Sequence, residues 1–380
     1  MANKLIINKK NLIEALAFGG ICAGVNKVLP ILDNIRLSFS EGDNQLKISS
    51  NSIDIAANTT VNTEEPSLES IDVCVPANFA KILNTITDYN VVLEFDEDNF
   101  RVVYHNGSAK FPVLPTDEFP HNFDTENSNL VSKCELPAQT LKYIISSCRN
   151  FLGNDDLRPM MKAICLSFGE GGVEYCATDA NRLISEKISV QNIVGEGTVL
   201  CIPKSTHRTL LSLIGDEEGC VVIKAYERFA TFEIGSKTAC ITLAEGKFPN
   251  YRSIIESSAS NKNKFTVLKD ELNASMQRMT LLSNINTNTV VLDCKNDKIE
   301  ISAENIDFGT RGNEEIEVKR LGENTEPVRI GFNATYLKDC LNEIVSGEVT
   351  LNLNLPSRAA VIADNDRPTK TVICMPVMIN

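Results

Sequence analysis

The sequence has 380 residues, of which 43% are hydrophobic, and a formal net charge of −13. This length suggests two or three domains, because one core rarely grows beyond about 250 residues. The excess of acidic residues argues against a protein that binds nucleic acid through its overall charge, although it does not exclude a local basic surface. No apolar run reaches the roughly 20 residues that span a bilayer, and the polar start is unlike a signal peptide. We therefore expect a cytoplasmic protein that does not enter a membrane.

Helical and strand patterns alternate along the chain in a regular order. Apolar residues at helical spacing predict helices within 9–23, 76–86, 137–152, 203–214, 269–283 and 333–345. Alternating apolar and polar residues predict strands in the segments between them, within 45–58, 90–114, 172–185, 219–244, 298–311 and 347–377. The glycine clusters at 169–172 and 195–197 each lie between strand-like runs, so they predict hairpin turns.

These elements form three copies of one unit. The segments that begin at Leu46, Val173 and Ile299 share an alternating strand, a small polar break and a second apolar run. Each repeat reads as strand, helix, strands, helix, strands. The predicted fold class is α+β, with three repeated domains that each pack two helices on antiparallel sheets. Polar segments at 123–129 and 256–264 predict domains at 1–125, 126–256 and 257–380.

The residue types usual in catalytic and metal sites give little support to either function. The 12 cysteines are scattered without a C-x-x-C pair, which favours reduced, buried side chains over metal ligands. The three histidines stand outside any zinc or nucleophile motif, so the usual metal and nucleophile chemistries have no support in the sequence. One enzymatic alternative uses Asp179 as an acid and Arg182 as an electrostatic clamp. It lacks a neighbouring base or nucleophile in the sequence.

Differences between the repeats point to the junction of the second and third. The second repeat has a longer polar break, "TDANRL" at 178–183, and the chain ends in the apolar stretch "CMPVMIN". Together with the link at 248–255, these segments predict an apolar groove with a polar edge, which suits a peptide or a small molecule. The alternative is that the same residues seal an interface between domains.

Five motifs in order resemble the bacterial β sliding clamps, the beta subunits of DNA polymerase III. They are "LPILDNIRL", "ATDANRL", "GKFPNYRSII", "GFNATY" and the terminal "MPV", and the resemblance runs from about Leu5 to the C-terminus. It implies a non-catalytic ring of two chains joined head to tail around double-stranded DNA, with no cofactor and no metal. It also implies partners that dock through short peptides: the replicative polymerase alpha subunit, the clamp loader, and repair and translesion polymerases. A scaffold that binds proteins but not DNA remains the alternative.

The resemblance assigns residues to three surfaces. The partner-peptide pocket falls on Met161, Thr178, Ala180, Asn181, Arg182, Leu183, Pro249, Ser253, Ile254, Asn333, Tyr336, Ile373, Cys374, Met375, Pro376, Val377 and Met378. The helix cations expected to face DNA are Lys9, Lys10, Lys27, Lys81, Lys142, Arg149, Lys204, Arg208, Lys269, Arg278 and Lys338. The dimer interface is expected at Ile82, Ile86, Phe111, Leu281 and Leu282, with ordinary core packing as the alternative for the first three. The family usually has Gly-His where Ala180 and Asn181 stand here.

Overall fold

The computed structural model describes residues 3–26, 28–96, 98–191, 193–195, 197–295, 297–321 and 326–379. Lys27, one of the predicted DNA-facing cations, lies outside them. The chain forms two compact units. Unit 1 comprises the described residues of Met1–Lys142, Asn192–Thr198 and Ser205–Leu243, and unit 2 those of Tyr143–Gln191, Val199–Lys204 and Ala244–Asn380. No described helix is both long enough and apolar enough to span a membrane.

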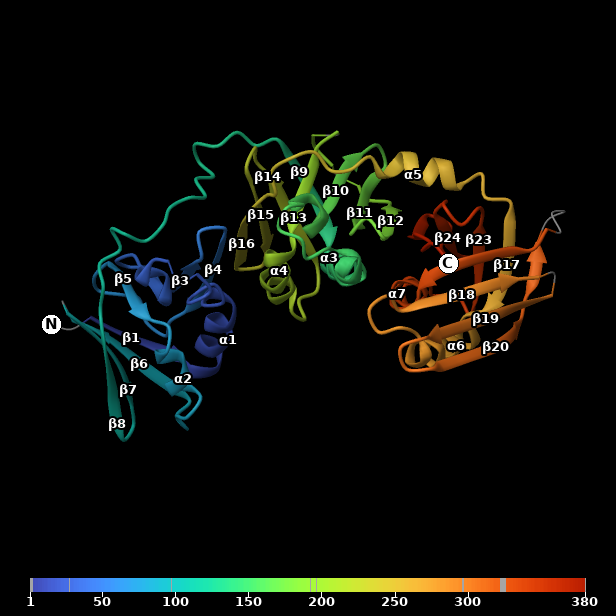
Figure 1. The fold of residues 1–380 in the computed structure, drawn as a ribbon. Helices are drawn as coiled ribbons and strands as arrows, with labels where there is room; N and C mark the ends of the chain where they lie inside the picture. The colour runs from blue at the N-terminus through green and yellow to red at the C-terminus, as the bar shows by residue number, and fades with distance from the viewer. Residues whose placement is uncertain are drawn as a thin grey trace. The chain divides into compact units, whose positions relative to one another are not determined.

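Unit 1 contains an eight-stranded and a four-stranded antiparallel sheet (Figure 1). The larger has the order β5-β2-β3-β4-β16-β15-β14-β9, built from β2 (Asn34–Phe39), β3 (Gln45–Asn51), β4 (Ile55–Asn62), β5 (Ile71–Pro76), β9 (Ser132–Pro137), β14 (Cys220–Ala225), β15 (Phe229–Ile234) and β16 (Lys237–Thr242). The smaller has the order β1-β6-β7-β8, built from β1 (Asn3–Asn8), β6 (Asn90–Phe95), β7 (Asn99–Tyr104) and β8 (Gly107–Pro112). Its helices are α1 (Lys9–Gly19), α2 (Phe79–Leu83), the start of α3 (Ala138–Cys148) and α4 (His207–Ile214).

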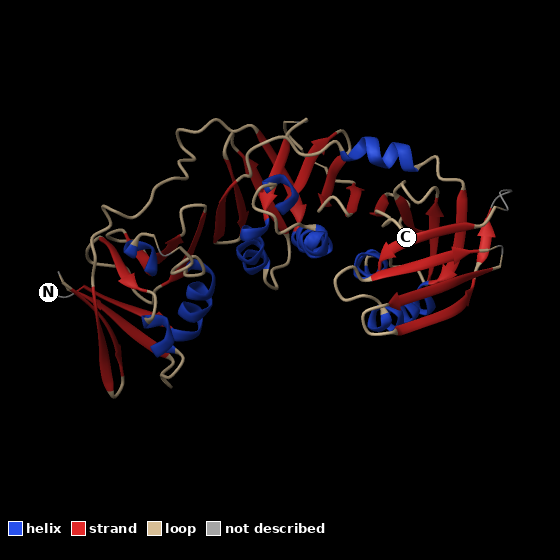
Figure 2. Cartoon of the chain, viewed as in Figure 1, coloured by secondary structure: helices blue, strands red, loops and turns tan. Residues whose placement is uncertain are grey.

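Unit 2 contains a nine-stranded and a four-stranded antiparallel sheet (Figure 2). The larger has the order β13-β10-β11-β12-β25-β24-β23-β17-β21, built from β10 (Ala163–Gly169), β11 (Gly172–Thr178), β12 (Arg182–Ile188), β13 (Val199–Pro203), β17 (Asn263–Leu268), β21 (Lys319–Leu321), β23 (Glu348–Leu353), β24 (Ala360–Asp364) and β25 (Lys370–Cys374). The smaller has the order β20-β19-β18-β22, built from β18 (Thr289–Cys294), β19 (Lys298–Asn305), β20 (Thr310–Glu317) and β22 (Val328–Asn333). Its helices are the end of α3, α5 (Tyr251–Ser258), α6 (Lys269–Leu282) and α7 (Ala334–Asn342).

The sheet orders display the threefold repeat directly. The orders β5-β2-β3-β4, β13-β10-β11-β12 and β22-β18-β19-β20 correspond, as do β1-β6-β7-β8, β9-β14-β15-β16 and β17-β23-β24-β25. Neighbouring repeats share a sheet, because β4 pairs with β16 and β12 pairs with β25. The central repeat consequently gives one sheet to each unit.

The two helices of every repeat are tied together in the same way. The first residue of α1, α3 and α6 donates its backbone N–H across the repeat, from Lys9 to Tyr89 O (2.9 Å), from Ala138 to Gly219 O (2.8 Å) and from Lys269 to Gly347 O (2.9 Å). Each acceptor lies a few residues beyond the second helix. These bonds fix the start of the first helix, where backbone N–H groups otherwise lack partners, against the segment that follows the second helix.

The interior is apolar in each unit. In unit 1, Phe79 of α2 packs edge-on against Phe100 of β7, with ring centroids 5.0 Å apart. All 12 cysteines are unpaired, and all except Cys220 are buried, which confirms the predicted burial for eleven of them. Burial raises the pKa of the Cys22 and Cys74 thiols to about 11.

Two details of the sequence prediction need correction. Residues 251–258, expected as part of a link, form helix α5. The glycines at 195–197 do not close a hairpin, because β13 pairs with β10 and is not a neighbour of β12. The other cluster does form the predicted hairpin, in which Gly169 faces Gly172 and Gly171 has φ +74°.

Candidate functional site

The corner between β11 and β12 is held by side chains that bond to its own backbone. The Asp179 carboxylate accepts N–H bonds from Asn181 (2.9 Å) and Arg182 (3.0 Å), which forms an Asx-type turn. The Thr178 hydroxyl donates to Arg182 O (2.8 Å) and accepts from Ala180 N (3.2 Å). Ala180 has φ +76°, a left-handed conformation that is costly for a residue with a Cβ. The polar break is thus a tight, strained turn.

Arg182 points from this corner onto helix α7. Its guanidinium forms ion pairs with Asp179 (3.2 Å) and with Asp339, and it lies over the Tyr336 ring, 4.6 Å from the centroid. The Arg182 side chain is only 11% exposed, so these contacts are largely shielded from water. Arginine suits this position because its flat, delocalised cation can stack on a ring and bind carboxylates at once.

The enzymatic alternative assigned an acid role to Asp179. Both of its carboxylate oxygens accept bonds within the turn, from the backbone of Asn181 and from the backbone and side chain of Arg182. The geometry therefore assigns Asp179 to holding the corner and orienting Arg182.

The other wall of the site is the junction of β12 and β25. Arg182 faces Cys374 and Leu183 faces Ile373 across this pair of strands. Leu183 and Ile373 belong to a buried apolar cluster, against which Met375 packs half-buried. The terminal stretch is held by backbone bonds as well, from Met375 N to Asn181 O and from Val377 N to Gly331 O, each 2.8 Å.

Helix α5 and the residues before it carry the next part of the predicted pocket. Ile254 is 40% exposed, and Met378 at the end of the chain is 78% exposed. Ser253 is exposed and bonds back to Asn250 O (2.8 Å), while Pro249 is half-buried. Two apolar side chains of the predicted pocket, Ile254 and Met378, are thus accessible to a ligand.

Two predicted pocket residues have clear structural roles. Asn333 caps α7, because its side chain accepts from Thr335 N (3.0 Å) and Tyr336 N (3.2 Å). Met161 is half-buried and its carbonyl accepts from Gly153 N (2.7 Å), whereas the neighbouring Met160 is the one buried in a small apolar cluster.

The structure also adds residues that the sequence did not single out. Phe151 lies 5.7 Å from the Arg182 guanidinium, Asp339 pairs with it, and Tyr251 and Phe248 pack into the apolar cluster. Asp339 lies three residues after Tyr336 on the predicted helix, so its shared face with that ring was the available signal.

The predicted DNA-facing cations differ in their partners and exposure. Lys9, Lys142 and Lys269 donate their ammonium groups to carbonyls that follow or end the second helix of their repeat: Ile86 O (2.5 Å), Gly215 O (3.1 Å) and Ile344 O (3.1 Å). Two others have side-chain partners, because Lys204 donates to Asn154 (2.8 Å) and Arg278 forms a bidentate pair with Glu314 (2.6 and 2.7 Å). Four other cations are exposed, namely Lys10, Lys81, Arg149 and Arg208. Lys338 is half-buried.

The residues expected at the dimer interface differ in exposure. Leu281 at the end of α6 is 83% exposed, and Leu282 is half-buried. On the other side, Ile82 and Phe111 are half-buried against the core of unit 1, while Ile86 is 7% exposed and belongs to that core.

Known proteins match this chain along its whole length. Profiles of the DNA polymerase III beta subunit match at residues 3–124 for its N-terminal domain, 135–250 for its central domain and 258–378 for its C-terminal domain. The beta sliding clamp of Vibrio cholerae is 24% identical, and that of Caulobacter vibrioides 26%; each match covers 99% of this chain and 100% of the relative.

Solved structures agree with the fold. A DNA polymerase sliding clamp from Pseudomonas aeruginosa superposes with a TM-score of 0.90 at 21% identity, covering 99% of this chain and all of that one. The beta subunit of Thermotoga maritima gives 0.87 at 18% identity, with complete coverage of both chains. Three consecutive profiles, full-length relatives and three repeated clamp domains show that this chain belongs to the DNA polymerase III beta subunit family, the bacterial β sliding clamps.

Proposed function

We propose that the chain is a non-catalytic processivity factor, two copies of which close head to tail around double-stranded DNA. It would hold the replicative polymerase and other partners through peptides bound at the corner of β11 and β12. Membership of the sliding clamp family supports this function. The observation that carries the ring is the set of strand edges that the chain leaves unused.

Within the described residues, β8 and β20 each have a neighbouring strand on one side only. Their counterparts in the other repeats are paired: β16 and β25 correspond to β8, and β4 and β12 correspond to β20. The internal repeat therefore leaves one edge of each kind. Pairing β8 of one copy with β20 of another would repeat the joint that already occurs twice inside the chain.

Apolar side chains beside β20 support an interface at this edge. Besides Leu281, the side chains of Ile285, Ile306 and Phe308 are 75%, 85% and 78% exposed. A bond from Asn284 to Asp307 (3.1 Å) holds their two segments together. Exposed apolar residues clustered in this way are expected where a partner covers them.

The DNA contacts are proposed to be weak and few. The ammonium groups of Lys9, Lys142 and Lys269 already donate hydrogen bonds to carbonyls that follow the second helices. The better candidates for phosphate contacts are therefore the exposed cations Lys10, Lys81, Arg149 and Arg208. A ring held by topology needs no tight phosphate contacts, and screened contacts let it slide.

The partner list and the boundaries follow the same proposal. The polymerase alpha subunit, the clamp loader and the repair and translesion polymerases would compete for the corner where Arg182 and Met375 meet, in the cytoplasm. The three domains would run over 1–125, 126–256 and 257–380, while the shared sheets place the compact units across those boundaries.

Retention on DNA tests the ring. After loading by purified clamp loader, the protein should remain on nicked circular DNA and leave once that DNA is linearised. Leu281→Lys should cut retention on circles by about tenfold, since it places a charge in the proposed interface. The matched control is Leu157→Lys, at a residue of unit 2 that is 90% exposed and lies outside that edge. Equal loss from circles and linear DNA would reject topological binding.

A further inference from the structure

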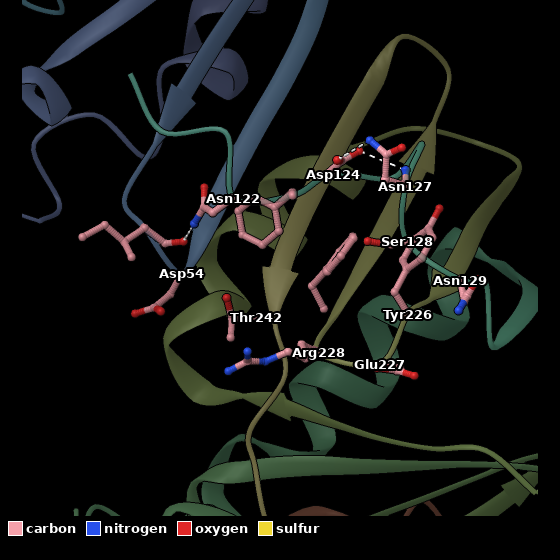
Figure 3. A pocket seen from close by; sticks show the side chains of 13 residues that line it. Asp54, Asn122, Asp124, Asn127, Ser128, Asn129, Tyr226, Glu227, Arg228 and Thr242 are labelled. Carbon is pink, nitrogen blue, oxygen red and sulfur yellow. Dashed lines mark hydrogen bonds between the residues drawn. The ribbon is translucent and has the colours of Figure 1, made fainter. Parts of the chain in front are cut away.

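Unit 1 has its own recess, about 500 Å³ in volume, where the first repeat meets the second. We call it the linker recess. Figure 3 shows the connecting segment with Asn122, Asp124 and Asn127 on one side and the loop of Tyr226, Glu227 and Arg228 on the other. Asp54 and Thr242 also line it.

The linker recess is built on the same backbone corner as the predicted peptide pocket of unit 2. Ser52 N bonds to Ile55 O (2.8 Å) as Asp179 N bonds to Arg182 O (3.4 Å). Ile53 and Ala180 occupy the same place in these corners, and both have φ +76°.

The adjoining strand is also held equivalently. Thr242 N donates to Asp54 O, and Met375 N donates to Asn181 O, each at 2.8 Å. The repeat has thus produced the frame of a groove twice within one chain. A β-branched residue such as Ile53 rarely adopts the left-handed conformation, so the surrounding structure must hold the backbone of this corner in place.

Aromatic rings form the apolar part of the recess. Tyr226 and Phe229 stack with centroids 4.5 Å apart and planes at 17°, and Phe123 meets Phe229 edge-on at 5.6 Å. Tyr226 and Phe229 are 7% and 8% exposed, so their packed rings form the rigid base of the recess, while Phe123 is half-buried. Such a surface favours an aromatic or aliphatic side chain.

The charges around the recess are predominantly negative. Among the lining residues, Asp54, Asp124 and Glu227 are acidic and Arg228 is the one basic residue. Asp124 accepts from Asn127 Nδ2 (2.7 Å) and from the backbone of Glu126 and Asn127 (both 3.1 Å), which fixes the path of the linker. A cationic ligand matches this charge, whereas DNA does not.

We propose that the linker recess is a second docking site, for a short peptide with an aromatic or aliphatic anchor residue flanked by Lys or Arg. The anchor lies on the Tyr226–Phe229 stack, and the flanking cations pair with Asp54 and Glu227. This site goes beyond the proposed function, because it uses different residues and requires neither the ring nor the corner of Arg182.

The probe is fluorescein-labelled Lys-Leu-Phe-Arg-Lys amide, titrated with the full-length protein and followed by anisotropy. The double variant Asp54→Lys/Glu227→Lys should weaken binding by about tenfold, since two exposed ion pairs become repulsive. Replacing Phe by Ala in the peptide should also cost about tenfold, because it removes the anchor. Asp216→Lys/Glu218→Lys is the matched control, at two exposed acidic residues of unit 1 outside the recess.

The controls separate this site from bulk charge and from the other pocket. Equal weakening by the control pair, or no effect of removing the Phe, would overturn the proposal. The same holds if Tyr336→Ala in unit 2 abolishes binding while the recess variants do not. Phe123→Ala, at a half-buried ring, should weaken binding without lowering the thermal midpoint by more than a few degrees. If the ring fails its own DNA-retention test, probe binding to the linker recess still stands.

Discussion

Replacing Ala180 with glycine should stabilise unit 2. Ala180 has φ +76°, and a Cβ in this left-handed region costs roughly 1–2 kcal/mol. Glycine at this position gives back about 0.4–1 kcal/mol through the greater freedom of the unfolded chain. The net gain is about 0.5–1 kcal/mol, which for a unit of this size raises the thermal midpoint by roughly 1–4 °C.

The assay compares thermal unfolding of the wild type, Ala180→Gly and Ala177→Gly. Ala177 lies three residues earlier, in strand β11 (Gly172–Thr178), and is fully buried. Glycine there removes a packed methyl from a strand interior, so the midpoint should fall. The two variants are therefore expected to shift the midpoint in opposite directions. A decrease for both would mean that the corner at Ala180 is not strained.

Three further predictions concern unit 1 and unit 2. A double-mutant cycle of Arg182→Met and Asp339→Asn, measured by urea unfolding, should give a coupling free energy of about 1–3 kcal/mol. The more exposed Arg252–Glu174 pair should give less than about 1 kcal/mol. Equal coupling energies would contradict the shielding of Arg182 from water. Gly172→Ala should lower the free energy of unfolding by more than about 2 kcal/mol, because the added Cβ would lie 2.1 Å from Ile188 O. In the same assay Gly171→Ala should lower it by only about 1 kcal/mol, because no atom lies within 4 Å of the added Cβ. A maleimide should modify Cys220 alone in the native protein and all 12 cysteines after denaturation, as counted by mass spectrometry; early labelling of a second cysteine would show that its element opens readily.

Local patterns were enough to predict six of the described helices and the threefold repeat. Helices α1 and α6 begin at Lys9 and Lys269, where the predicted segments also begin, because their apolar spacing is a property of neighbouring residues. Helix α5 escaped prediction. Its sequence, Tyr251–Ser258, is short and rich in serine, and only Tyr251 and Ser258 are buried.

The features that could not be predicted depend on residues far apart in the chain. The pairing of β4 with β16 joins segments of two repeats, and nothing in either strand alone specifies it. The roles of Lys9 and Lys142 could not be predicted for the same reason. A lysine on a helix is expected to be solvent-exposed, and only the fold brings a carbonyl that follows the second helix close to it. At the corner, the sequence indicated a polar break, but the left-handed Ala180 and the stacking of Arg182 on Tyr336 required the fold.

The shared sheets bear on how such a chain assembles. Three separate repeats would each carry two joining edges, and every joint would have to form by collision between molecules. Covalent linkage makes two of these joints intramolecular, where the effective concentration of the partner edge reaches the millimolar range for a short connection. In the proposed ring, only the joints between β8 of one copy and β20 of the other would then depend on protein concentration. Opening and closing the ring at these joints would leave the sheets within each chain intact.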